Sequence, residues 1–182
     1  MQNYMDLAIF FDSFAVAGDK DLLINLKDDL FNKLHDKDVF MAYFAKATLT
    51  FDTPNTIANF MTKSHNIDIK KAAVFPIVQG IRSLALREKI RETTTVKRIK
   101  ILEEKKVLEK SKAAELLEAF DVVNTLRLKA QLDDIQDGKI INNEIDTHSL
   151  GKIERDLLKD SFKIVIEFKK FINYTFRIDK IS

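Results

Sequence analysis

Two pairs of aspartates have the spacing with which metal-dependent transferases hold divalent cations. They are Asp19-Lys20-Asp21 and Asp36-Lys37-Asp38. In nucleotidyl transfer, such carboxylates bind the metal ions that neutralise phosphate charge. Both pairs, however, stand where a helix is expected to begin, and an aspartate there caps free backbone N–H groups and favours the helix dipole. No Gly-Ser pair precedes either one, so we interpret both as helix-capping sequences rather than as metal ligands.

The remaining residue types offer little for catalysis. The three histidines, His35, His65 and His148, are isolated, and no two are spaced by one helical turn, so a metal site is not expected. The four glycines are far apart, which excludes a glycine-rich phosphate loop. The chain has no cysteine and therefore no disulfide framework, thiolate zinc site or cysteine nucleophile. Because no nucleophile, base and orienting group can be assembled, the sequence predicts no independent enzyme.

Arginines on apolar helix faces are the most informative polar residues. Arg82 interrupts an otherwise apolar stretch. Arg127 shares one face of a long predicted helix with Phe120, Val123 and Gln131. A guanidinium group that is buried without a partner strongly destabilises a fold. Each of these arginines must therefore have a partner.

Two explanations remain open for the partner of Arg127. The first is an ion pair within the protein, with Glu118, Asp121, Asp134 or a carboxylate of another helix. The second is an anionic ligand in a cleft, which arginine binds well because its planar group donates two hydrogen bonds at once. Internal pairing is the more frequent role of a buried arginine, so we take it as the default and the ligand as the functional alternative.

Apolar periodicity places these side chains on helices. We expect helices over residues 20–34, 39–51, 57–62, 67–90, 96–105, 111–137 and 152–177. Loops are expected over residues 63–66 and 139–150. The low number of turn-forming residues, with four Gly and two Pro, also favours long helices over a β fold with many turns.

Local signals mark the helix boundaries. Residues able to cap a helix precede three of the predicted helices: Asp19, Thr93–Thr95 and Ser111. Pro76 is expected to bend or interrupt its helix, because proline lacks a backbone donor. Gly138 is a natural helix stop. Gly151, followed three residues later by Glu154, resembles a capping box that lacks its hydroxyl.

The run Ile9–Phe14 is the exception to the helical pattern. It is apolar, has the look of a lone strand, and precedes a turn at Gly18-Asp19. With the predicted helices, it indicates an all-α fold: an up-and-down helical bundle of about five to seven helices with a short N-terminal extended segment. A length of 182 residues suits one domain, and 46% apolar residues are enough for a core. No apolar run reaches the length of a membrane span, and residues 1–6 do not form a secretory signal.

Two surfaces could serve partners. The stretch Leu86–Lys112 holds ten Lys and Arg residues against five Glu and could contact phosphate. It lacks interleaved aromatic residues, so a solvated helix face is the better interpretation, and nucleic acid is not an expected partner. An aromatic stripe consists of Phe40, Tyr43, Phe44 and Phe51. It is either core packing, which is the usual role of such a stripe, or an exposed partner face.

Four segments, in this order, resemble one family. They are "LAIFFDSFAVAGDKDLL", "IDIKKAAVFPIVQGIRSLALREKIRETTTVKRI", "AFDVVNTLRLKAQL" and "NEIDTHSLGKIERDLLK". Together they are similar to the C-terminal, all-helical substrate-binding domain of putative nucleotidyltransferases. In that family the domain often follows CBS domain pairs and cyclic-nucleotide-binding domains, and the catalytic half is similar to protein-PII uridylyltransferase.

The resemblance implies site residues at matching positions. The matches are Asp12, Gly18, Asp19, Asp68, Lys70, Pro76, Ile77, Arg82, Ala85, Leu86, Thr95, Arg98, Leu126, Arg127, Leu128, Gln131, Asn143, Leu150 and Glu154. The substrate-binding residues it implies are Arg82, Arg98, Arg127, Gln131, Asp68 and Lys70, without catalytic or metal-binding residues. The chain departs from the family at three places: Phe14-Ala15 replaces Arg-Pro, Ala72-Ala73 replaces glycine, and Ala130 replaces histidine.

The resemblance also implies a catalytic half that this chain lacks, because that half supplies the Gly-Ser turn and the Asp-x-Asp ligands. Residues 1–18 are then a remnant or linker of the missing nucleotidyltransferase domain, and residues 19–182 are the helical substrate-binding domain. Leu7–Phe14 would be irregular, docked on the bundle, or paired with a strand of another molecule. No cofactor is expected in this chain itself, since nucleotide and Mg²⁺ would come only with the catalytic domain.

Two functions follow as hypotheses. The first is a non-catalytic substrate-binding module of a nucleotidyltransferase in cytoplasmic signal transduction, whose partners are the nucleotidyltransferase domain and the CBS or cyclic-nucleotide-binding domains of the same full-length protein. The alternative is a structural or regulatory interaction domain with no ligand of its own, which could form a homodimer. No membrane partner is expected.

Overall fold

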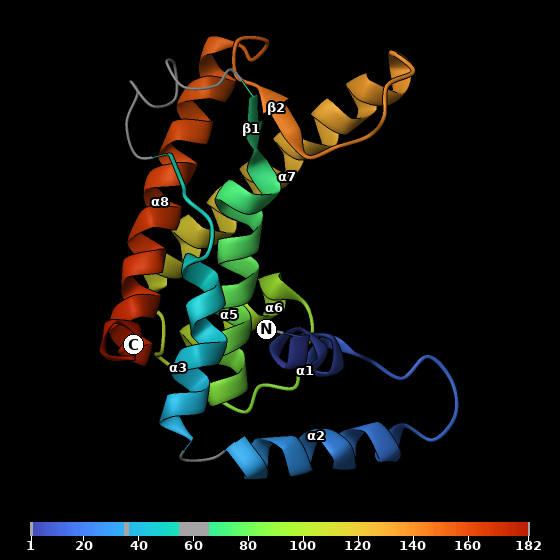
Figure 1. The fold of residues 1–182 in the computed structure, drawn as a ribbon, viewed down its shortest axis with the longest axis vertical. Coiled ribbons are helices and arrows are strands. Elements are labelled where there is room, and N and C mark those ends of the chain that lie inside the picture. Colours follow the sequence, from blue (N-terminus) through green and yellow to red (C-terminus); the bar gives the residue numbers. More distant parts are fainter. Residues whose placement is uncertain (1, 35–36, 55–65, 182) are drawn as a thin grey trace.

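The computed structural model describes residues 2–34, 37–54 and 66–181, and in these ranges the protein is a bundle of helices (Figure 1). The main helices are α1 (Gln2–Asp12), α2 (Lys20–Leu34), α3 (Asp38–Lys46), α5 (Phe75–Arg87), α6 (Thr95–Glu104), α7 (Lys110–Gln136) and α8 (Lys152–Phe176). The predicted all-α bundle is confirmed. The predicted helix over 57–62 and most of the loop over 63–66 lie outside the described residues.

Short elements complete the chain. Strands β1 (Asn66–Asp68) and β2 (Glu144–Asp146) pair antiparallel, with Ile67 opposite Ile145. A π-helical turn, η2 (Lys70–Val74), leads directly into α5, and 3₁₀ turns cover Ala47–Leu49 and Ile178–Lys180. The loop expected over 139–150 therefore contains a strand. Its pairing partner is distant in sequence, so a local pattern could not reveal it.

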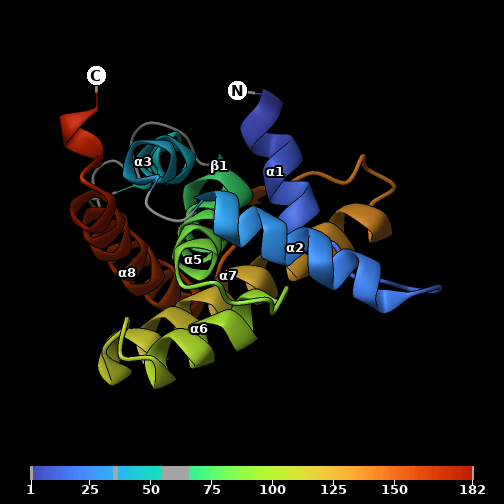
Figure 2. The same ribbon diagram turned by 90° about the horizontal axis from the view of Figure 1, so that it is seen from below.

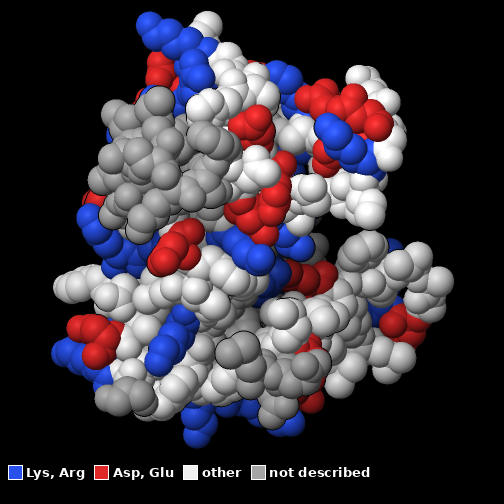
Figure 3. Space-filling view, turned by 45° about the horizontal axis from the view of Figure 1, so that its top comes forward, with Lys and Arg blue, Asp and Glu red and all other residues white. Residues whose placement is uncertain are grey.

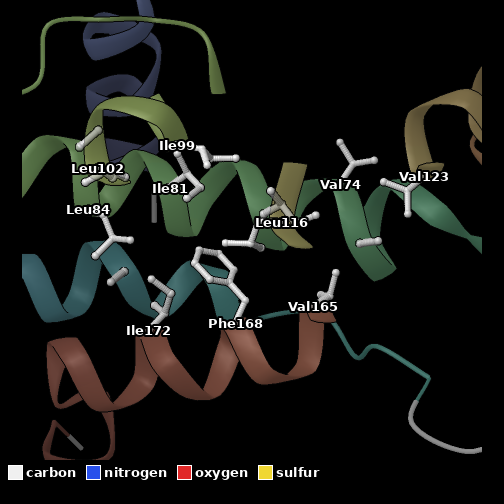
Figure 4. Close-up of a cluster of buried hydrophobic side chains, with 14 of the residues drawn as sticks. Val74, Ile81, Leu84, Ile99, Leu102, Leu116, Val123, Val165, Phe168 and Ile172 are labelled. Carbon is white, nitrogen blue, oxygen red and sulfur yellow. The ribbon is translucent and has the colours of Figure 1, made fainter. Parts of the chain in front are cut away.

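Helix α5 is central to the bundle (Figure 2). Helices α3 and α8 pack on one side of it and α6 on another, while α7 packs on α8, α6 and the η2 turn. Figure 4 shows apolar side chains of these helices meeting in one cluster, among them Ile81 of α5, Ile99 of α6, Leu116 of α7 and Phe168 of α8. Fully burying one side chain of this size stabilises the fold by about 1.5–3 kcal/mol, so this cluster fixes how the helices lie against one another.

The start of α5 differs from the prediction of one helix over 67–90. Ile67 and Asp68 belong to β1, and the helical turns begin at Lys70. Pro76 lies in the first turn of α5, where the π-helical turn gives way to a regular α-helix. The helical backbone continues through Val74 and Phe75, so Pro76 does not break it; the proline lies in the first turn of α5, where a residue without an N–H group is tolerated.

The predicted N-terminal extended segment is wrong. Residues 9–12 are the last turn of helix α1, and only residues 13–19 are non-helical. Ala8 and Phe11 are buried, and Phe11 meets Phe31 of α2 edge to face with ring centroids 5.9 Å apart. This three-residue spacing is helical, but a short apolar run fits a strand or a helix equally well until its packing partner is known.

Several boundary residues act otherwise than predicted. Asp19 caps α2 as expected, since its Oδ1 accepts a hydrogen bond from the Asp21 N–H at 2.9 Å. Neither α6 nor α7 has a side-chain cap at its start, and Ser111 lies inside α7. The backbone N–H groups of Thr93 and Thr94 instead donate to the carboxylate of Glu92. The Glu92 carboxylate thus stabilises the turn before α6, and the expected hydroxyl capping of this helix is wrong.

The aromatic stripe is mainly core packing. Phe44 is fully buried, and Phe40 stacks on it with ring centroids 6.5 Å apart. Phe51 meets Phe75 edge to face at 5.3 Å. Tyr43 keeps an exposed fraction of 38%. These contacts remove most of the reason for reading the stripe as a partner face. Among the described residues, no helix is both long and apolar enough to cross a membrane.

Candidate functional site

Three helices meet at the carboxylate of Asp12. This residue ends α1, and both arginines around it come from other helices. Arg82 of α5 donates from Nε and Nη2 to Asp12 Oδ2, at 2.9 and 2.6 Å. Nη1 of Arg98, on α6, lies 2.7 Å from Asp12 Oδ1 in an ion pair. We call these three residues the Asp12 cluster. It joins the first helix of the chain to the centre of the bundle.

Arg98 is the most buried cation of the cluster. Its side chain is 1% exposed, and its guanidinium group lies 4.4 Å from the centroid of the Phe11 ring. Its Nε donates to the backbone carbonyl of Glu92 at 2.6 Å, while its Nη2 has no hydrogen-bond partner among the described residues. Burial lowers the pKa of Arg98, and the positive charge of Arg82 lowers it further, whereas Asp12 opposes both. The cluster therefore holds more positive charge than its one carboxylate neutralises.

A third cation lies beside the Asp12 cluster. Lys27 of α2 is buried, and its Nζ donates to the carbonyl of Ser13 at 2.6 Å, just after the end of α1. Burial lowers the pKa of Lys27, and Arg98 adds to this effect. A cation is favourable at this position because the C-terminal end of a helix carries partial negative charge. Lys27, Arg82 and Arg98 thus hold the end of α1 from three different helices.

Buried Gln79 fixes the orientation of Arg82. Its Oε1 accepts a hydrogen bond from Arg82 Nη1 at 2.6 Å, and its Nε2 donates to the carbonyl of Phe44 at 3.0 Å. The amide therefore links the arginine to α3. Since Gln79 binds Nη1, the Nε and Nη2 donors of Arg82 keep their direction toward Asp12. The guanidinium group is therefore preorganised to bind a carboxylate or another oxyanion.

An open groove of about 700 Å³ lies between α1 and the η2–α5 segment. Its walls are mostly apolar: Met5, Ala8, Ile9, Phe14, Val74, Phe75 and Val78. Its polar lining consists of Asp12, Ser13, Lys70 and Arg82. Figure 3 shows basic and acidic side chains next to one another in a hollow near the middle of one face. Arg82 and Asp12 form one charged end of the groove, and Lys70 lies about three helical turns from Arg82, at the other end of the apolar walls.

Comparison with known proteins adds the family to this geometry. Residues 38–176 match the family model described as putative nucleotidyltransferase substrate binding domain. The chain belongs to this family. No curated protein and no solved structure matches the chain. Lys70, Arg82 and Arg98 lie inside the region that matches the substrate-binding domain family, whereas Asp12 and Lys27 lie before it.

The structure brings together three of the six predicted site residues of this substrate-binding domain. Arg82 and Arg98 share Asp12, and Lys70 lines the same groove as Arg82. Lys70 is exposed and forms no ion pair within the part of the chain that the structure describes. Arg82 and Asp12 form one charged end of the groove, Arg98 lies buried behind them, and Lys70 lies at the other end.

The other three predicted residues lie elsewhere. Arg127 Nε donates to the side-chain oxygen of Asn143 at 2.8 Å, and Gln131 Nε2 donates to the carbonyl of Asn142 at 3.1 Å. Both contacts tie α7 to the segment before β2. Asp68 forms an ion pair with Lys71 at 3.1 Å and accepts a hydrogen bond from its N–H. Arg127 thus has an internal hydrogen-bond partner, but that partner is a neutral amide, and the expected ion pair with a carboxylate is not found among the described residues.

Sequence reasoning missed two residues of the site, Lys27 and Gln79. Lys27 follows Leu23 by four residues and precedes Phe31 by four, so it lies on the apolar face of its helix. Gln79 interrupts the apolar segment between Ala72 and Ile81. A lone polar residue on an apolar helix face is the signal that could have identified both. The Asp12 position was matched to the family, but its role as the shared partner of two arginines was not foreseen.

The arrangement offers binding rather than metal chemistry. Among the described residues, no group of three or more His, Asp or Glu side chains is placed to hold a metal ion. His148 lies exposed in the loop after β2, while His35 and His65 lie outside the described residues. The strongest chemical capacity of this part of the molecule is therefore recognition of a negative group by arginine and lysine.

Proposed function

We propose that this chain is the non-catalytic substrate-binding module of a nucleotidyltransferase and that its acceptor substrate binds in the groove between α1 and α5. The observation that carries the proposal is the lining of this groove: Lys70 and Arg82, both inside the matched family region, lie at the two ends of an apolar channel. The family description supports binding of a substrate, and the groove supports a location for it.

The lining of the groove suggests the kind of acceptor. Val78 and Phe75 of α5 face Met5 and Ile9 of α1 across an apolar channel, which suits the body of an amphipathic molecule. Lys70, at the end of the groove away from Arg82, has no internal ion-pair partner in the described ranges, so its ammonium group is free to meet a negative group of the ligand. We infer an acceptor that has an apolar body and one anionic end.

Nucleotide and Mg²⁺ chemistry is assigned to a separate nucleotidyltransferase domain of the same full-length protein. This assignment rests on the family and on the sequence segments that resemble it. CBS or cyclic-nucleotide-binding domains are the proposed further partners, and signal transduction in the cytoplasm is the proposed setting. Residues 1–18 are proposed to connect the two halves.

The groove can be tested with the anionic apolar dye 1-anilinonaphthalene-8-sulfonate in a fluorescence titration. Val78→Phe narrows the channel, and we expect it to weaken dye binding by about tenfold, since the apolar body loses its place. Ile153→Phe adds the same ring at a residue of α8 that is 76% exposed, and it should leave binding unchanged. Equal affinities of both variants would exclude the groove as the binding site.

The non-catalytic assignment has its own test. The 182-residue chain is incubated with Mg²⁺ and each of the four nucleoside triphosphates, and pyrophosphate release is measured. We expect no release above the buffer control. Release that depends on the protein would show that the chain itself is a transferase.

A second candidate function, an interaction or dimerisation domain, is favoured by one observation. Leu128, Leu132 and Ile135 of α7 are 57%, 49% and 55% exposed, and their spacing places them on one helix face. Sedimentation velocity of the wild-type protein and of Leu132→Glu at several concentrations decides this point. A dimer that the substitution dissociates favours the second candidate, and a monomer at all concentrations excludes self-association through this face.

A further inference from the structure

We propose that Asp12 is an internal occupant of an anion site formed by Arg82 and Arg98, and that a ligand bearing a phosphate group displaces Asp12 together with α1. The inference rests on the proposed function in one respect, since Arg82, which belongs to the anion site, also forms one charged end of the same groove. It adds the chemical class of the anionic end and a conformational step that opens the groove.

The charges of the cluster favour a dianion over a single carboxylate. Arg82, Arg98 and Lys27 surround the end of α1, and Asp12 is the one carboxylate that contacts the two guanidinium groups within the described part of the chain. Glu92, whose carboxylate accepts from the backbone N–H groups of Thr93 and Thr94, adds a second negative charge near Arg98 and Lys27, so three cations still exceed two carboxylates. A phosphate group carries close to two negative charges at neutral pH and would balance the excess that Asp12 leaves.

The hydrogen bonds of the cluster lead to the same class of ligand. Nη2 of Arg98 is buried and has no partner in the described ranges, although a buried donor without a partner is destabilising. Both hydrogen bonds from Arg82 to Asp12 go to the same oxygen, Oδ2. A phosphate group has three acceptor oxygens and can serve both arginines and the unused nitrogen, which a carboxylate with two oxygens does not do here.

Helix α1 has the features of a displaceable element. It lies outside the matched family region, whereas both arginines lie inside it. It is attached through the non-helical residues 13–19, where Gly18 has a positive φ of 82°. Its groove side carries Met5 and Ile9, which are 55% and 64% exposed, so this side of α1 is only loosely packed. Because α1 forms one wall of the groove, moving it away both frees the arginines and widens the channel.

An internal competitor lowers the apparent affinity for the external anion. The ligand binds only to the fraction of molecules whose arginines are free, so removing the Asp12 charge or loosening α1 should raise the affinity. This consequence distinguishes the proposal from a purely structural ion pair. In a purely structural cluster, loosening α1 with every charge in place would create no phosphate site, whereas removing the Asp12 charge frees two guanidinium groups in either case.

The test compares Asp12→Asn with Asp28→Asn in titrations with inorganic phosphate, followed by isothermal calorimetry and by the melting temperature at constant ionic strength. Asp28 is the matched control, because it also precedes the family region and pairs with an arginine inside it, Arg91, but on an exposed surface. We expect Asp12→Asn to bind phosphate about tenfold or more tightly than the wild-type protein and Asp28→Asn. Acetate should bind more weakly than phosphate, and adding Arg82→Gln to Asp12→Asn should abolish the gain.

A second variant keeps the test decisive if Asp12→Asn does not fold. Tyr4 of α1 packs on Phe40 and Phe44 of α3, with ring centroids 5.4 and 6.4 Å apart. Tyr4→Ala loosens α1 but leaves every charge of the cluster in place, so it should also bind phosphate more tightly than the wild-type protein. If neither variant that folds gains phosphate affinity over the wild-type protein, the proposal is wrong.

The outcome also separates this inference from the proposed function. If the two variants gain phosphate affinity but Val78→Phe and Ile153→Phe bind the dye equally well, the anion site is supported and the acceptor groove is rejected. Dye binding that Val78→Phe weakens, without any gain in phosphate affinity, would keep the groove and reject the displacement of Asp12.

Discussion

The ring of Phe168 on α8 lies directly over Gly80 of α5. A Cβ atom on residue 80 would come within 2.5 Å of Phe168 Cε1 and 3.1 Å of Ile172 Cγ1, both of which belong to the buried core. The absence of a side chain at Gly80 therefore sets how closely the central helix and α8 approach. Gly80 lies on the side of α5 away from the groove, so this contact fixes α5 against α8 on that side.

Gly80→Ala is expected to destabilise the protein by about 1–3 kcal/mol, because the added methyl group overpacks a core that has no room for it. The free energy of unfolding in urea, followed by circular dichroism, measures this effect. Gly151→Ala is the matched control, since a Cβ there meets only Glu154 Oε2 at 3.6 Å. A Gly80→Ala variant as stable as this control would contradict the close packing of α5 on α8.

Gly151→Ser is expected to stabilise the protein by a few tenths of a kcal/mol. The Gly151 N–H already donates to Glu154 Oε2 at 2.9 Å, so half of a capping box is present at the start of α8. A serine hydroxyl adds the missing acceptor for the backbone of the first turn. Urea unfolding of Gly151→Ser and Gly151→Ala side by side checks this, and equal stabilities of the two would show that the hydroxyl does not cap the helix.

Arg98→Ala is expected to lower the free energy of unfolding by about 3–5 kcal/mol, because it removes one member of a buried ion pair and leaves Asp12 with less compensation. Arg91→Ala provides the comparison. Arg91 also pairs with an aspartate, Asp28, through its Nε and Nη2, but its side chain is 58% exposed, so its loss should cost less than about 1 kcal/mol. Similar losses for both variants would show that burial does not strengthen the Asp12 cluster.

Acid should weaken the fold partly through Glu92. Hydrogen bonds from the backbone N–H groups of Thr94 and Thr93 hold the pKa of Glu92 below its ordinary value of 4.5. A carboxylate whose pKa is lower in the folded state adds stability above the unfolded pKa, and this contribution is lost as the pH falls through the folded pKa. The wild-type protein should therefore lose stability below pH 4.5, and Glu92→Gln should lose less.

Melting temperatures measured between neutral pH and the acid range test this expectation. Glu118→Gln is the control, because Glu118 is exposed on α7 and makes no hydrogen bond to any residue that the structure describes. If the melting temperatures of the wild-type protein and Glu92→Gln fall in parallel as the pH is lowered, the Glu92 carboxylate does not stabilise the turn before α6.

The sequence alone determined those features that depend on neighbouring residues. Helix α2 has the predicted bounds, because leucine spacing and the Asp19 cap act within a few residues of one another. The stop at Gly138, which has a positive φ of 66°, is equally local. The all-α class followed from the same periodicity, repeated along the chain.

Tertiary structure decided the state of the N-terminal segment and the partners of the arginines. The run Ile9–Phe14 fits a strand in sequence, and only the packing of Phe11 against Phe31 shows that its first part is helical. Arg127 has several carboxylates near it in sequence, but its Nε donates to the side chain of Asn143. Arg82 and Arg98 were both singled out in sequence, yet their meeting at Asp12 requires α1 to dock where α5 and α6 lie side by side. Periodicity and capping are set by the local backbone, whereas the partner of a buried charge is set by which distant side chains the packed core brings to it.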